Sequence, residues 1–98
     1  MIAFGEVLRR SAKRLGLEPA VQLVETREAW ESIVGPDLAR ASHVLSLRGG
    51  LLVVAAHHSL VAQEIKMRRG GILAALGGRV GAPPTRLQVV IRPKAKSG

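Results

Sequence analysis

The feature that most constrains the fold is a pair of short segments on either side of a two-residue glycine turn. AWESIVG, at residues 29–35, ends in a glycine followed by a proline, and SLVAQEI begins at residue 59. Glycine adopts the left-handed conformation that ends a helix, and proline cannot continue one. Gly49-Gly50 lies between two aliphatic runs and suits a hairpin turn. The spacing therefore predicts a helix end, a hairpin and a helix start in that order.

Two helices are predicted before the hairpin. Residues 2–15 place Phe4, Leu8, Ala12 and Leu15 on one face and their cations on the opposite arc. A second helix is predicted from Glu18-Pro19 to Gly35, with Leu23, Trp30 and Val34 as its apolar stripe. Trp30 is interpreted as a core residue, and residues 37–40 as a short turn.

The rest of the chain is predicted to complete a small sheet. Strands at 43–48 and 51–56 would pair Leu47 with Leu52 and Leu45 with Val54, so that Val44 faces the other way. A third helix, residues 59–76, is expected to break at Gly70-Gly71, because each glycine costs about 1 kcal/mol relative to alanine. Residues 77–84 read as a loop and 87–92 as a third strand. This order predicts an α+β fold, a three-stranded sheet with helices on one face.

Charge is strongly segregated along the chain. The net charge is +8; residues 18–40 carry five acidic and two basic residues, whereas residues 41–98 carry nine basic residues and one acid, Glu64. Such segregation favours one surface that faces a polyanion and another that does not. The alternative is that the charge only maintains solubility.

The composition argues against an enzyme. There is no cysteine, no serine in a nucleophile elbow, and no apolar run long enough to span a bilayer. His57-His58 are adjacent and would point in different directions, so no metal site is predicted. No cofactor and no small-molecule substrate are expected, and the chain is predicted to be cytoplasmic.

Basic residues form two candidate contacts for nucleic acid. The cationic arc of residues 2–15 would bind phosphates without reading bases, and Arg68-Arg69-Gly70-Gly71 would offer backbone N–H groups and guanidiniums at a helix start. The alternative for this joint is that its glycines allow close helix–sheet packing. The predicted nucleic-acid-binding residues are Arg9, Arg10, Lys13, Arg14, Lys66, Arg68, Arg69, Gly70, Gly71 and Arg79.

A protein-docking surface is also predicted. The second face of the hairpin carries Val44, Leu51 and Val53, which a partner could cover. The acidic helix, with Glu25 and Glu28, is the other candidate.

The order and spacing of AWESIVG, the hairpin and the SLVAQEI helix start resemble the DciA-like family, bacterial replicative-helicase loaders with a KH-like domain. The resemblance implies a single KH-like domain over residues 1–92. Residues 93–98 are themselves predicted to form a short basic flexible tail. Gly78-Arg79-Val80-Gly81 matches the GxxG pattern of KH domains, but it leads into a strand rather than joining two helices, so the Arg68–Gly71 joint is better placed.

The resemblance further implies a non-enzymatic factor of DNA replication that helps the DnaB-type helicase onto single-stranded DNA, associated with the nucleoid. The chain lacks a P-loop, so loading would use binding energy alone. Two alternatives stay open: an RNA- or ribosome-associated KH-like module, and a structural adaptor that binds through its open sheet face.

Overall fold

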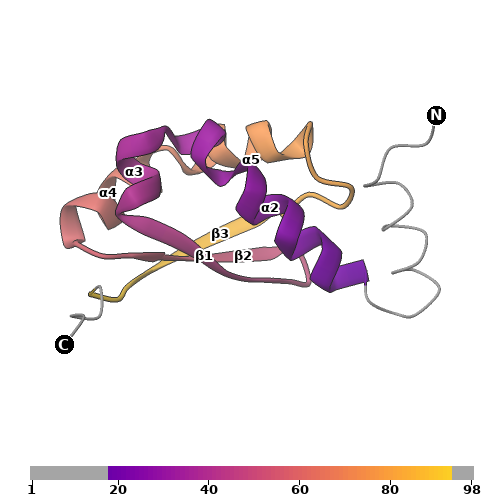
Figure 1. Ribbon diagram of the computed structural model, residues 1–98, viewed down its shortest axis with the longest axis horizontal. Coiled ribbons are helices and arrows are strands. Elements are labelled where there is room, and N and C mark those ends of the chain that lie inside the picture. The colour runs from indigo at the N-terminus through magenta and orange to yellow at the C-terminus, as the bar shows by residue number, and fades with distance from the viewer. Residues whose placement is uncertain (1–17, 94–98) are drawn as a thin grey trace.

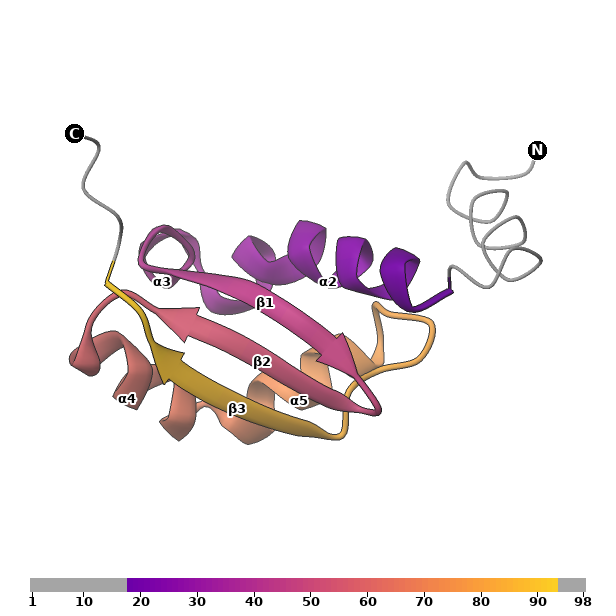
Figure 2. The ribbon, with the colours of Figure 1, turned by 90° about the horizontal axis from the view of Figure 1, so that it is seen from below.

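Helices cover one face of a small mixed sheet in the computed structural model, which describes residues 18–93 (Figure 1). β1 (Ser42–Arg48) and β2 (Leu51–Ala56) pair antiparallel, and β3 (Arg86–Ile91) lies parallel to β2 on its other side. Figure 2 shows the opposite face of this sheet with none of the described helices in front of it. The predicted α+β fold is confirmed, and its architecture is compatible with a KH-like domain. The predicted helix at residues 2–15 lies outside the described residues.

Helix α2 (Glu18–Val34) ends where glycine and proline predicted. Gly35 has a φ of +92°, and Pro36 begins a second, five-residue helix, α3 (Pro36–Arg40). The prediction of a turn over residues 37–40 is therefore wrong, because the structure has a short helix there. Proline favours the first position of a helix, where its missing N–H is not needed, so a new helix can begin directly after Gly35.

Trp30 is a core residue, as predicted. Its side chain is 4% exposed, and its Nε1 donates a hydrogen bond to Ser42 Oγ at 3.0 Å. The Ser42 hydroxyl in turn donates to the carbonyl of Leu38 at 2.5 Å. This buried chain of hydrogen bonds joins α2, β1 and α3, because the indole N–H needs an acceptor once the ring is buried.

One part of the predicted hairpin is wrong. Leu47 pairs with Leu52, but Val54 pairs with Val44 instead of Leu45, because a β-bulge lies between Val44 and Ser46. The extra residue reverses the alternation of the first half of β1. Val44 is consequently 2% exposed and part of the core, so its assignment to an exposed docking face does not hold.

The predicted break between the last two helices is confirmed, but it lies two residues before the predicted Gly70. Helix α4 (Ser59–Met67) and helix α5 (Arg69–Gly77) meet at Arg68. Gly70 and Gly71 lie in the first turn of α5, where their cost in helix stability falls at an end and not in the interior. Ile65 of α4 and Leu76 of α5, both fully buried, anchor the two helices on the sheet.

The hairpin turn is tied to the start of β3. Gly49 and Gly50 have φ values of +56° and +79°, and the carbonyl of Gly50 accepts hydrogen bonds from the N–H groups of Thr85 (2.8 Å) and Arg86 (3.0 Å). A Cβ on Gly50 would lie 2.9 Å from Thr85 Oγ1. The glycine thus serves both the turn and the close approach of β3.

Candidate nucleic-acid interface

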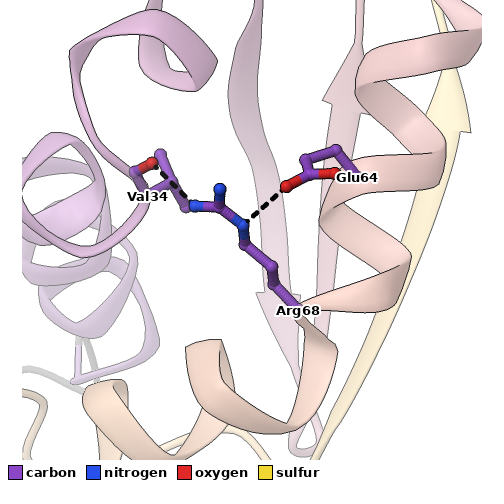
Figure 3. A network of polar contacts seen from close by, with 3 residues as sticks. All are labelled: Val34, Glu64 and Arg68. Carbon is purple, nitrogen blue, oxygen red and sulfur yellow. Dashed lines mark hydrogen bonds and ion pairs between the residues drawn. The ribbon is translucent and has the colours of Figure 1, made fainter.

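Arg68, at the joint between α4 and α5, is held by the fold. Its Nε donates to Glu64 Oε1 at 2.9 Å, one turn earlier in α4, and its Nη1 donates to the carbonyl of Val34 at 3.5 Å, at the end of α2 (Figure 3). The second of these is at the limit of hydrogen-bond length. Arg68 therefore braces three helices, and less of its charge is available to a ligand than the sequence predicted.

Lys66 and Arg69, on either side of Arg68, are available to a ligand. Both are exposed, and neither side chain makes a hydrogen bond or ion pair within residues 18–93. Gly70 and Gly71 are exposed as well, and a Cβ at either position would meet nothing within 4 Å. Close helix–sheet packing is thus not the reason for these glycines, which leaves an open backbone next to two cations.

Arg69 shares a hollow with Arg86, the first residue of β3. The hollow measures about 360 Å³, and its remaining lining residues are Leu51, Leu73, Thr85 and Leu87. Arg86 is exposed and, like Arg69, bonds no other residue of the described chain through its side chain. No acidic residue occurs among these lining residues, so the hollow is lined by two arginines and by no residue of opposite charge.

Arg86 was missed at the sequence level, as was Arg48 at the end of β1. The register places Arg48 opposite Leu51 on one side and Arg86 opposite Leu51 on the other. For Arg86, the available signal was the complete absence of acidic residues after Glu64, which leaves this arginine without a carboxylate nearby in the sequence. Pairing of β3 with β2 was needed to bring the two together.

The remaining predicted residues lie elsewhere. Arg79 follows α5 and its guanidinium donates to the hydroxyl of Ser32 on α2, so it is bonded to a different helix from the joint. Arg9, Arg10, Lys13 and Arg14 lie outside the described residues.

The predicted protein-docking residues fall on both layers. Leu51 and Val53 are partly exposed on the open face of β2, because Leu52 and Val54 point into the core. Glu28 is exposed on α2, whereas Glu25 is half-buried. Every acidic residue at positions 18–93 belongs to a helix, and every strand is free of acids. The two layers therefore differ in charge.

His57 pairs with a residue other than its neighbour His58. Its Nε2 lies 3.2 Å from Nδ1 of His43 on β1, and the two rings are tilted by 49°. Among residues 18–93, no three histidine, cysteine or acidic side chains come together as a metal site. Nor is any helix in this part of the chain long and apolar enough to cross a bilayer.

Comparison with known proteins places this domain. Residues 3–89 match the family described as Dna[CI] antecedent, DciA. A UPF0232 protein of Rhodococcus jostii (strain RHA1) is 30% identical over 94 residues, which cover 96% of this chain and 50% of that protein. The chain thus spans about half the length of this curated relative. Since the family match extends over most of the sequence, the chain belongs to the DciA family.

Proposed function

We propose that this domain is a non-enzymatic accessory factor of DNA replication that binds single-stranded DNA and assists the loading of the DnaB-type helicase. Membership of the DciA family supports a role beside the replicative helicase. The observation that carries the DNA-binding part is that the exposed Arg69 and Arg86 line one hollow with no acidic residue among its lining, while the exposed Lys66 lies three residues before Arg69.

The chemistry of this group fits a sugar-phosphate backbone. Two arginines line one hollow and can each give paired N–H donors to a phosphate. Trp30, the one phenylalanine, tyrosine or tryptophan among residues 18–93, is buried, and no aromatic residue lines the hollow for bases to stack on. Binding is accordingly expected to be salt-sensitive and tolerant of sequence.

The protein partner would meet the acidic surface of α2. Glu28 and Glu31 are exposed on this helix. A negative surface there keeps DNA away from the protein contact, since like charges repel. The helicase is proposed to dock on this side.

Fluorescence anisotropy with a labelled oligo(dT) tests the DNA-binding part. The double substitution Lys66→Gln/Arg69→Gln should weaken binding and reduce the slope of log affinity against log salt by about 1.4, at about 0.7 per lost contact. Arg40→Gln is a control for a single charge, since Arg40 is exposed on α3 and paired with Asp37. Binding that is unchanged in the double variant contradicts the proposed site.

The same titration with oligo(U) tests the RNA-binding alternative. Tighter binding of RNA than DNA would favour an RNA-associated module. Absence of binding to both at low salt would favour an adaptor. Capture of the DnaB-type helicase on immobilised protein tests the partner separately.

A further inference from the structure

We propose that the bound single strand continues from the α4–α5 joint across the end of the open sheet face, where Arg86 and Arg48 hold its phosphates. This inference deepens the proposed function and rests on its DNA-binding part. It adds Arg48, on the far edge strand, to a site that otherwise ends at β3.

The three arginines form a continuous series. Arg69 and Arg86 line the same hollow, and Arg86 and Arg48 flank Leu51 in register. The outer strands of a three-stranded sheet are about 10 Å apart, so two long arginine side chains can reach neighbouring phosphates of one strand. We call Arg69, Arg86 and Arg48 the sheet-end arginines.

The fold holds this series in place. Gly50 belongs to the turn that follows Arg48, and its carbonyl binds the N–H of Arg86 at 3.0 Å. The two arginines on the sheet are therefore fixed to the same tight turn from opposite sides. Such a rigid spacing is what a site for a repeating phosphate chain requires.

The face itself favours a polyanion over a protein. Along the row of Arg48, Leu51 and Arg86 there is one partly exposed aliphatic side chain between two exposed cations. No acid occurs in any of the three strands, and Figure 2 shows this face uncovered by the described helices. Leu51 would contact a sugar or the edge of a base, and sequence would not be read.

Parallel single substitutions separate the joint from its extension. Arg48→Gln and Arg69→Gln should each weaken the binding of an oligo(dT) of about 15 nucleotides several-fold and make its salt slope shallower by about 0.7. Arg40→Gln removes the same charge on α3 and should not weaken binding by as much.

Four results would overturn the inference. If Arg48→Gln binds the oligonucleotide like the wild type while Arg69→Gln is impaired, the strand does not cross the sheet and the proposed function stands. If Arg48→Gln and Arg40→Gln are equally impaired, net charge explains the loss. If Arg48→Gln impairs only helicase capture, the face is a protein surface. Absence of binding by the wild-type protein refutes the proposed function as well. Unchanged circular dichroism and Tm establish that Arg48→Gln is folded.

Discussion

Gly50 offers the sharpest test of how the hairpin turn positions the start of β3. Gly49 and Gly50 are adjacent, and both have a positive φ, but their surroundings differ. A Cβ on Gly49 would meet nothing within 4 Å, whereas a Cβ on Gly50 would lie 2.9 Å from Thr85 Oγ1. The same substitution at the two positions therefore isolates the contact between the turn and β3.

Two contributions set the loss of stability on substitution by alanine: the left-handed backbone conformation and the contact with Thr85. An alanine held in the left-handed region costs about 1–2 kcal/mol at either position. The contact with Thr85 adds about 1 kcal/mol for Gly50→Ala, since a β-branched side chain cannot move aside without a rotamer change. A domain of this size loses about 4–8 °C of Tm for each kcal/mol, so Gly50→Ala should melt about 4–8 °C below Gly49→Ala.

Far-ultraviolet circular dichroism measures the Tm of both variants on heating and their free energy of unfolding in urea. Thr85→Ala serves as the rescuing substitution. Thr85 Oγ1 makes only a long, exposed hydrogen bond of 3.5 Å to the Gly50 carbonyl, so Thr85→Ala alone should cost little. Combined with Gly50→Ala, it should recover about 1 kcal/mol, because the clashing atom is gone. Equal stability of Gly49→Ala and Gly50→Ala, or no recovery in the double variant, would refute the reasoning.

Three further expectations concern stability and binding. Ser42→Ala should cost about 1–3 kcal/mol in urea denaturation, because the buried Trp30 N–H loses its acceptor. Ser59→Ala, at the exposed first position of α4, is its control and should be nearly neutral. Arg68→Gln should lower the free energy of unfolding by at most about 1 kcal/mol, since its ion pair is half-exposed, and should leave DNA affinity close to that of the wild type. The last variant replaces Arg9, Arg10, Lys13 and Arg14 together by glutamine. It should abolish binding to single-stranded DNA in anisotropy without a large change in Tm, and a large loss of Tm would identify these residues as structural.

Local signals in the sequence were sufficient to predict the ends of the helices and the hairpin turn. Gly35 followed by Pro36 ends α2 at the predicted place, because both residues act on the backbone directly and need no tertiary context. Gly49-Gly50 likewise gives the predicted two-residue turn. The break before α5 followed from the helix cost of two glycines, although the structure moves it to Arg68.

The candidate site was less accessible, because it depends on pairing between distant segments. Arg68 looked equivalent to Arg69 in the sequence, yet the approach of α2 and α4 gives it two partners. Arg86 looked like an isolated cation before a strand. Its role depends on parallel pairing with β2, a contact over 35 residues, and no local pattern encodes that register.

The bulge in β1 shows how strand pairing that local sequence does not encode changes which residues enter the core. Regular alternation would have placed Leu45 inside and Val44 outside, but the extra residue turns Ser42 and Val44 inward together. Ser42 then meets the Trp30 indole, which would otherwise be buried without an acceptor. The same change leaves the second half of β1 in its predicted phase, with Leu47 inside and Arg48 outside. A bulge between the two halves thus lets one strand satisfy a buried tryptophan at one end and present a cation at the other.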